Sequence, residues 1–185
     1  MAQTPSNMLA LGTSAFEFSL NEPLTGKTIF LPEFVAGRPF VLMFICNHCP
    51  FVKHINEELV KLALEYTPKG IAFIAISSND AEAYPEDGPE KMKTYALQLR
   101  YPFPYLYDSS QDIARVYEAA CTPDFYVFNN SAKLVYRGQL DDSRPSNGIP
   151  VTGKDIRKTV NHLLEGSPVS PDQIPSVGCN IKWKK

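Results

Sequence analysis

The order of a buried strand, an amphipathic helix and a second buried strand constrains the fold of this chain more than any other feature. Residues 39–45 (PFVLMFI) are almost wholly apolar, as expected of a strand covered on both faces. Apolar residues then recur at steps of three and four from Val52 to Tyr66, which marks one face of a helix. Residues 71–76 (IAFIAI) form a second apolar run. This order predicts two parallel strands joined by a right-handed crossover.

Two cysteines lie where the first strand meets the helix, in the segment Cys46-Asn47-His48-Cys49. At a helix start, cysteines with this spacing fall on the same side of the first turn, close enough to bond to each other. The N-terminal end of a helix carries partial positive charge and unpaired N–H groups, which favour a thiolate over a thiol. Because the thiolate is the reactive form of cysteine, this junction is the first candidate for a reactive site.

The composition limits the classes of partner. The 185 residues are 44% hydrophobic and 21% charged, which is typical of a globular protein with a substantial core. A net charge of −2 gives no electrostatic argument for nucleic acid or an anionic membrane, and no apolar run is long enough to span a bilayer. The sequence also shows no secretory signal, so for a complete chain we expect a cytoplasmic protein with reduced cysteines. In that setting a Cys-x-x-Cys pair favours catalysis or metal binding over a structural disulfide.

The rest of the chain alternates short strands with helices. The first dozen or so residues and residues 166–185 show no regular pattern, and we expect a loose lead-in and an irregular tail. The remaining elements that we expect are a hairpin of residues 16–20 and 28–31, a helix from Pro89 to Leu99, a short helix to Ala119 capped by Asp108 and Gln111, a hairpin of residues 125–128 and 134–136, and a helix to Leu164 capped by Thr152 and Asp155.

This order, with a Cys-x-x-Cys after the first buried strand and Cys121-Thr122-Pro123 before a hairpin, resembles the thioredoxin superfamily. It is most similar to the redoxin branch, which includes peroxiredoxin-like and thiol–disulfide isomerase-like proteins. The resemblance covers roughly residues 16–165. It implies an α/β thioredoxin-like fold with a central mixed sheet flanked by helices, an N-terminal β-hairpin and an irregular C-terminal tail. It also implies one domain over residues 1–185.

The resemblance assigns roles to individual residues. Cys46 would be the nucleophile and Cys49 the resolving thiol of a thiol–disulfide oxidoreductase or isomerase. Pro123 would be cis and would face this pair, and Thr122 would dock the substrate. The implied partners are a disulfide substrate, either a protein or a small thiol, and a recycling reductant; no cofactor and no metal is expected.

His48 stands directly before the second cysteine, as in disulfide isomerases and periplasmic disulfide oxidases. A nearby imidazolium would stabilise a thiolate at Cys46 and make the pair more oxidising, with the pKa of Cys46 between about 3.5 and 7. The alternative interpretation is a loop histidine without electrostatic consequence.

The sequence departs from two familiar members of the superfamily. Thioredoxins carry a buried acid six positions before the first cysteine, where this chain has Phe40, so His48, Lys53 or water must accept the proton of the resolving thiol. Peroxiredoxins require Thr or Ser three positions before the peroxide-attacking cysteine and Pro seven positions before it. Counted back from the second cysteine, these positions hold Cys46 and Leu42. A peroxiredoxin-like antioxidant peroxidase therefore remains only an alternative.

Two further cysteines are possible accessory thiols. Cys121 lies two residues before Pro123 and is either redox-active or a buried apolar residue. For Cys179 the hypothesis is that the tail folds back and that its thiol bonds with the active-site group; the alternative is that it packs elsewhere. All four cysteines around zinc would make a non-catalytic binding module, although such a site usually has a second tight ligand pair. A redox-sensing interaction protein is the third alternative.

Overall fold

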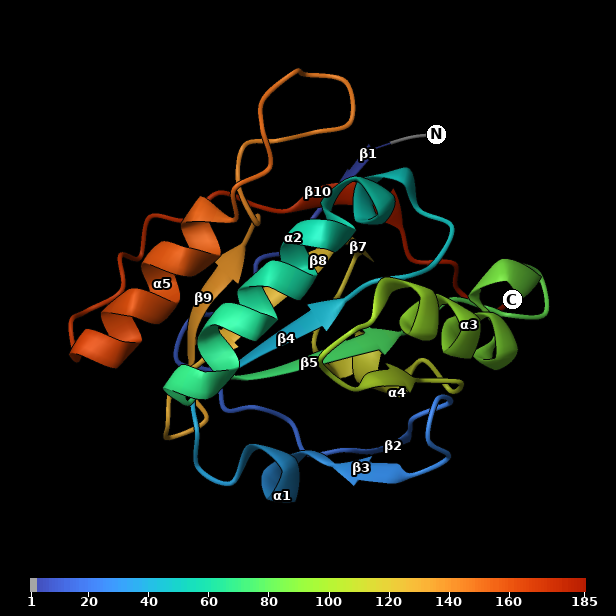
Figure 1. Ribbon diagram of the computed structural model, residues 1–185, viewed down its shortest axis with the longest axis horizontal. Helices are drawn as coiled ribbons and strands as arrows, with labels where there is room; N and C mark the ends of the chain where they lie inside the picture. Colours follow the sequence, from blue (N-terminus) through green and yellow to red (C-terminus); the bar gives the residue numbers. More distant parts are fainter. Residues whose placement is uncertain (1–2) are drawn as a thin grey trace.

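The computed structural model describes residues 3–185. It contains a seven-stranded mixed sheet and a smaller three-stranded sheet (Figure 1). In sheet order, the large sheet consists of β3 (Thr28–Phe30), β2 (Ser19–Asn21), β6 (Tyr105–Tyr107), β5 (Ala72–Ser77), β4 (Phe40–Phe44), β8 (Asp124–Phe128) and β9 (Leu134–Gly138). The small sheet consists of β1 (Gln3–Pro5), β10 (Val177–Asn180) and β7 (Cys121–Thr122).

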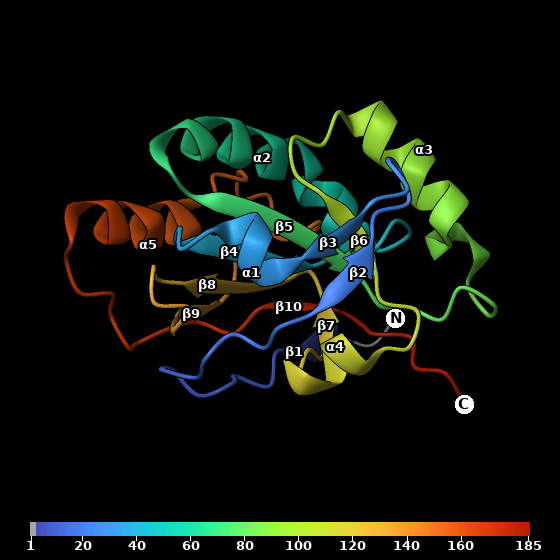
Figure 2. The same cartoon turned by 90° about the horizontal axis from the view of Figure 1, so that it is seen from below.

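Helices cover both faces of the large sheet (Figure 2). One face carries α2 (Pro50–Tyr66), α3 (Pro89–Leu99) and α5 (Lys154–Glu165), and the other carries α1 (Leu31–Val35) and α4 (Asp112–Val116). Two short 3₁₀-helices, η1 (Thr67–Lys69) and η2 (Pro85–Asp87), complete the secondary structure of residues 3–185. No helix in this range is long and apolar enough to cross a membrane.

The central strand β4 explains why its sequence is apolar without interruption. Val41 and Met43 pack toward α2, whereas Phe40, Leu42 and Phe44 pack toward the opposite face. Every residue of β4 is therefore buried. It pairs in parallel with β5 and antiparallel with β8. The expected mixed sheet flanked by helices is confirmed, and β2 pairs antiparallel with β3 as the N-terminal hairpin.

The two ends of the chain are more regular than the sequence indicates. Gln3 in β1 pairs with Cys179 in β10, and Cys179 pairs in turn with Thr122 in β7. The expected loose lead-in and irregular tail are thus wrong for residues 3–5 and 177–180. Strands of two to four residues are too short to show the alternation that identifies a strand. Residues 166–176 contain no helix or strand, as expected.

The two expected helix caps differ in outcome. Helix α4 begins after Gln111, which makes no side-chain cap, but Asp108 accepts a hydrogen bond from the Ala114 N–H in the first turn and so caps the helix from before the N-cap position. The expected cap of α5 is wrong: the helix begins after Gly153 and has no side-chain cap, and the N–H groups of Thr152 and Gly153 donate to the distant Asp141.

Candidate active site

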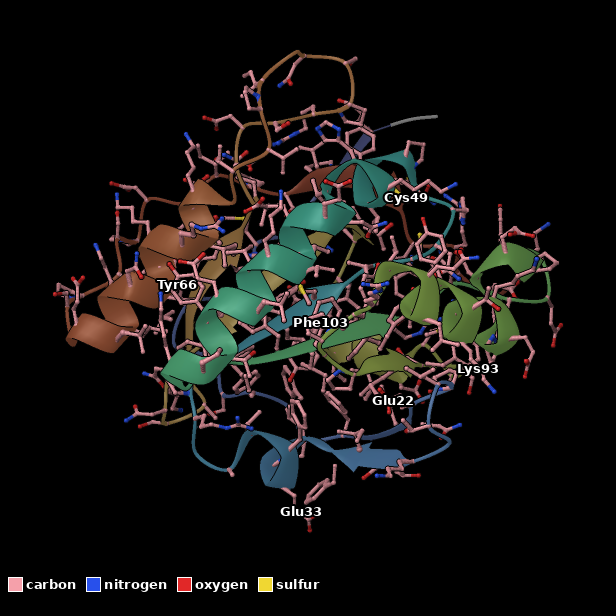
Figure 3. The ribbon with its side chains drawn as sticks, in the orientation of Figure 1. Glu22, Glu33, Cys49, Tyr66, Lys93 and Phe103 are labelled. Atoms are coloured by element: carbon pink, nitrogen blue, oxygen red, sulfur yellow. The ribbon has the colours of Figure 1, made fainter. Side chains whose placement is uncertain are left out.

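The Cys46–Cys49 segment connects the carboxyl end of β4 to α2. Cys49 lies at the N-terminal end of α2 (Figure 3). It has extended backbone angles and occupies the N-cap position, and Pro50 follows in the first helical turn. Proline suits this position because its missing N–H would have no partner within the helix. Cys46 and Cys49 are only 1% and 0% exposed. The two thiols are therefore ordered next to the helix N-terminus and shielded from solvent.

Thr122 contacts both thiols. Its hydroxyl oxygen lies 3.4 Å from the sulfur of Cys46, and its carbonyl oxygen lies 3.1 Å from the sulfur of Cys49 and accepts a hydrogen bond from it when this thiol is protonated. The Thr122–Pro123 peptide bond is cis. Thr122, which precedes the cis bond, thus lies in contact with the sulfurs of both Cys46 and Cys49.

Cys179 completes a set of adjacent thiols. The tail folds back, and β10 places the sulfur of Cys179 2.9 Å from that of Cys49. Cys179 is itself buried, at 3% exposed. Gly178 permits this approach, since a Cβ there would lie 2.0 Å from the Thr122 carbonyl oxygen.

The pKa values place the negative charge of the reduced site on Cys49. The pKa of Cys49 is lowered to about 5, first by its hydrogen bond with Cys46 and then by those with Cys179 and the Val52 N–H, against the opposing effect of burial. The pKa of Cys46 is raised by its hydrogen bond with Cys49, by burial and by the charge of Asp87. Burial and Cys49 raise the pKa of Cys179 to about 12. One thiolate thus lies beside two protonated thiols, which favour it by donating hydrogen bonds.

This distribution corrects the expected low pKa at Cys46. Cys49, rather than Cys46, lies at the N-cap, where the helix dipole and the free N–H groups act most strongly. Cys46 lies closer to the charge of Asp87, which opposes its ionisation.

His48 is oriented by an acid that the sequence reading missed. Its Nδ1 lies 2.5 Å from Asp87, and its ring stacks on Tyr84 at a centroid distance of 5.7 Å. Asp87 is fully buried and also accepts hydrogen bonds from the N–H groups of Asn47 and His48 and from the side chain of Asn79. It therefore fixes both the imidazole and the backbone between the two cysteines. No local pattern marks Asp87, because the residues it orients lie about 40 positions earlier.

The buried acid of this site comes from a different element than in thioredoxins. Phe40, at the thioredoxin position, stacks on Phe128 in the apolar core at 4.7 Å between ring centroids. Asp87 instead arrives from η2, on the side of the loop that carries His48. Lys53, another expected proton acceptor, is exposed on α2.

A second buried acid, Asp124, follows Pro123 directly but does not serve the thiols. It accepts hydrogen bonds from the hydroxyl groups of Ser6 and Tyr126, on the opposite face of the sheet. Burial raises its pKa to about 7. Asp124 therefore belongs to the network that joins the N-terminal segment to the sheet.

The cysteines do not gather as the zinc alternative requires. Cys121 is buried, and its S–H donates to the carbonyl oxygen of Pro123 at 3.6 Å. Within residues 3–185, the one group of three potential ligand residues with donor atoms less than 4.8 Å apart is Cys46, His48 and Asp87. This group contains one of the four cysteines, and its carboxylate already accepts four hydrogen bonds.

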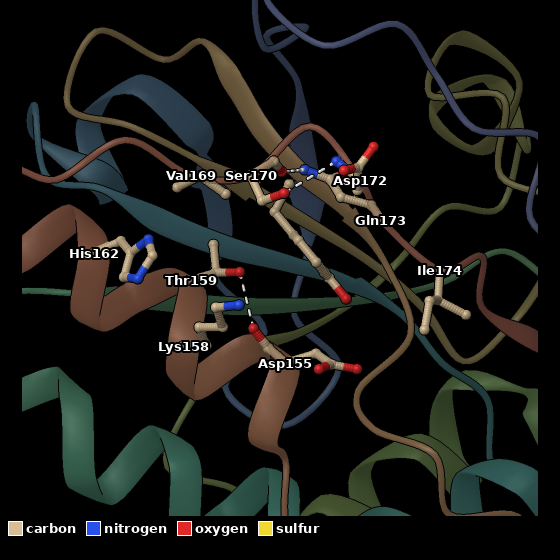
Figure 4. A pocket seen from close by; sticks show the side chains of 10 residues that line it. Asp155, Lys158, Thr159, His162, Val169, Ser170, Asp172, Gln173 and Ile174 are labelled. Carbon is tan, nitrogen blue, oxygen red and sulfur yellow. Dashed lines mark hydrogen bonds between the residues drawn. The ribbon is translucent and has the colours of Figure 1, made fainter.

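Two hollows are informative about access. A hollow of about 280 Å³ adjoins the outer side of the Cys46–Cys49 loop and is lined by Asn47, His48 and Lys53, among others, but not by a cysteine. A smaller one of about 90 Å³ lies between α5 and the following segment, where Thr159 and Gln173 bond to nearby backbone groups (Figure 4). It contains no thiol and is remote from the site.

Solved structures with similar folds fall into two groups. An uncharacterized conserved protein from Geobacillus kaustophilus shares 58% sequence identity with a TM-score of 0.97, covering 100% of this chain and 97% of that one. A hypothetical protein from Sinorhizobium meliloti 1021 shares 46% identity with a TM-score of 0.95, covering 98% of each chain. The thioredoxin domain of a thiol-disulfide oxidoreductase from Bacteroides vulgatus shares 18% identity with a TM-score of 0.66, covering 84% of this chain and 99% of that one. This last similarity concerns the fold alone.

Sequence comparisons define the family. A search of curated proteins finds no match. The family model described as AhpC/TSA matches residues 11–137, which include β4, the two cysteines of the loop and the Thr122–Pro123 bond. The chain therefore belongs to the AhpC/TSA family and is a redoxin of the thioredoxin superfamily.

Proposed function

We propose that this protein is a thiol–disulfide oxidoreductase in which Cys46 and Cys49 form the redox pair. The observation that carries the proposal is the placement of Cys46 and Cys49 in the loop that leads into α2, with Thr122 in contact with both sulfurs. A stabilised thiolate favours the reduced form of the pair, which makes its disulfide more oxidising. The redoxin family and the fold shared with a thiol-disulfide oxidoreductase support the same class of chemistry.

In the proposed reaction Cys49 holds the negative charge at rest and serves as the base for Cys46. Cys46 passes its proton to Cys49, and its thiolate attacks one sulfur of a substrate disulfide and releases the other as a thiolate. That substrate thiolate takes up the proton from Cys49, and the Cys49 thiolate then attacks the sulfur of Cys46 and releases the second substrate sulfur, which is protonated from solvent. A pKa of about 5 suits this second role, because a resolving thiol must be ionised when it attacks. The net reaction converts one substrate disulfide and two protein thiols into one protein disulfide and two substrate thiols.

The substrate is a disulfide of a protein or a small thiol, and a thiol reductant returns the pair to the reduced form. The hollow beside His48 offers space next to the loop. Because both sulfurs are buried, a substrate reaches them only when the segments packed over the cysteines move away.

The test is oxidation of the reduced protein with glutathione disulfide and with insulin as substrates, followed by acid quenching, alkylation and peptide mapping. We expect a Cys46–Cys49 disulfide and catalysed reduction of insulin in the presence of a thiol reductant. Cys46→Ser and Cys49→Ser should abolish turnover, and Cys121→Ser should retain it. Turnover that survives in both active-site variants would exclude the proposal. Rapid consumption of hydrogen peroxide without disulfide reduction would favour the peroxidase alternative.

A further inference from the structure

The C-terminal strand occupies the free edge of the strand segment that precedes Pro123. β10 pairs antiparallel with β7, with Cys179 opposite Thr122 and Asn180 opposite Cys121. On its other edge β10 pairs with β1, so it is held between two strands. An external peptide can pair with Thr122 only after β10 has left this position.

We propose that Cys179 is a third redox thiol, which replaces Cys46 as the disulfide partner of Cys49. This inference rests on the proposed function, because the first disulfide must come from substrate. In the product, a disulfide joins Cys49 to Cys179 in the C-terminal strand β10, where Cys179 takes the place of a substrate thiol.

The geometry favours this exchange. The sulfurs of Cys49 and Cys179 are 2.9 Å apart, so a disulfide of about 2.0 Å requires an approach of about 0.9 Å. The contact does not depend on a flexible tail, since β10 has a fixed register against Thr122. Cys121 is a useful contrast: it lies in the neighbouring strand and is equally buried, but its S–H is directed to the Pro123 carbonyl.

The chemical step is an internal thiol–disulfide exchange. Starting from the Cys46–Cys49 disulfide, the thiolate of Cys179 attacks the sulfur of Cys49. The bond between Cys49 and Cys46 breaks, its electron pair leaves on Cys46, and Cys46 takes up the proton that Cys179 lost. One disulfide is exchanged for another, so no further oxidant is consumed.

The first oxidation also prepares Cys179 for attack. Burial and the neighbouring Cys49 raise the pKa of Cys179 in the reduced protein. Once Cys49 is part of a disulfide it carries no charge, and its contribution to this shift disappears. Cys179 therefore ionises more readily in the state in which its attack is required.

Peptide mapping of three proteins tests the proposal: the wild-type protein, Cys46→Ser and Cys179→Ser, with Cys121→Ser as the matched control. Each is reduced, exposed to glutathione disulfide, quenched in acid at intervals and alkylated. In the wild type we expect Cys46–Cys49 first and Cys49–Cys179 later. Cys46→Ser should convert its Cys49–glutathione adduct into Cys49–Cys179, and Cys179→Ser should stop at Cys46–Cys49. Cys121→Ser should reproduce the wild-type sequence of products.

The outcomes separate this inference from the proposed function. If wild type stops at Cys46–Cys49, Cys179 does not replace Cys46 as the disulfide partner of Cys49, the inference is overturned and the proposed function stands. If neither wild type nor Cys179→Ser forms Cys46–Cys49, the proposed function fails and this inference fails with it. The disulfides formed in the wild-type protein are enough to contradict the inference, so the test remains valid even if one of the variants folds poorly.

Discussion

Cys49 lies between two other cysteines with shifted pKa values, and this position determines the titration of the whole site. Its thiolate accepts hydrogen bonds from two thiols and lies at the start of a helix, which together outweigh the cost of burial. The thiolate should therefore be present at neutral pH and disappear as the pH falls through about 5.

The ultraviolet absorbance of the thiolate measures this titration. We expect about one thiolate per reduced molecule at pH 7, and its loss on acidification with a midpoint near pH 5. Cys49→Ser should remove this step, and Cys179→Ala should move the midpoint to higher pH because the hydrogen bond that Cys179 donates to the Cys49 thiolate is lost. Cys121→Ser should leave the midpoint unchanged. A step that persists in Cys49→Ser would assign the thiolate to another cysteine.

Asp87 acts on Cys46 through its charge and on the loop through its hydrogen bonds. Asp87→Asn keeps an acceptor oxygen but removes the charge that helps to raise the pKa of Cys46. We expect the pH profile of Cys46–Cys49 formation to move to lower pH. The stability should fall by roughly 1–3 kcal/mol, since one buried donor loses its partner. Glu86→Gln, an exposed neighbour, is the control. Superimposable profiles for wild type and Asp87→Asn would show that Asp87 has no electrostatic effect on the thiols.

The sequence identifies the residues of the site better than it identifies their charges. Their spacing and the strand–helix order point to Cys46 and Cys49, whereas the family resemblance points to Thr122. The direction of the pKa shifts depends on which sulfur lies at the N-cap and which lies nearer to Asp87. Both facts are matters of tertiary geometry, which local spacing does not contain.

At the scale of elements, strand β10 packs over the thiols of the site, and Gly178 allows this strand to lie close to the backbone of Thr122. A Cβ at this position would approach both the carbonyl group of Thr122 and the nitrogen of Pro123. The neighbouring atoms are backbone and cannot rotate away, so a methyl group must displace the strand. Overpacking of this kind costs about 1–3 kcal/mol.

Gly178→Ala should therefore expose the thiols. We expect the alkylation rate of Cys49 in the reduced protein to rise about 10- to 100-fold, since each 1.4 kcal/mol that favours opening changes the open population tenfold. Asn180→Ala, an exposed position on the same strand, should react like wild type. Equal rates in all three proteins would indicate that β10 does not limit access.

Elements differ in how far their sequences reveal them. Strands β4 and β5 are long and buried on both faces, so their apolar runs are unambiguous. β1, β7 and β10 contain two to four residues, and their pairing joins the two ends of the chain. β6 has only three residues, and the sequence shows no strand pattern there either. Such strands are stabilised by pairing with segments distant in sequence, so their own residues show no pattern from which a strand could be predicted.

At the scale of the molecule, Pro123 lies between a strand of the large sheet and a strand of the small sheet. β8 continues into the core of the large sheet, whereas β7, on the other side of Pro123, belongs to the small one. Within residues 3–185, strands β1 and β10 pair only within the small sheet, and hydrogen bonds such as the Ser6 hydroxyl to Asp124 and the Lys182 N–H to Asn79 join their flanking segments to the rest. Because no strand of the large sheet pairs with β1 or β10 in the part of the chain that the structure describes, these two strands are suited to open together while the large sheet remains folded.

Hydrogen exchange of the reduced wild-type protein tests this cooperative opening. Amides of β1 and β10 should exchange with a common free energy of opening that is lower than that of β4 and β5. The reason is that strands β1 and β10 bury less apolar area and must move away before a substrate can reach the thiols. In Cys46→Ser oxidised to the Cys49–Cys179 disulfide, their exchange should slow by a factor of roughly 30 or more. A cross-link that constrains the open state typically contributes about 2–4 kcal/mol, and each 1.4 kcal/mol is tenfold. Oxidised Cys179→Ser, which lacks this cross-link, should retain fast exchange. If β10 in the reduced protein exchanged only with global unfolding, substrate would have to reach the thiols by another route.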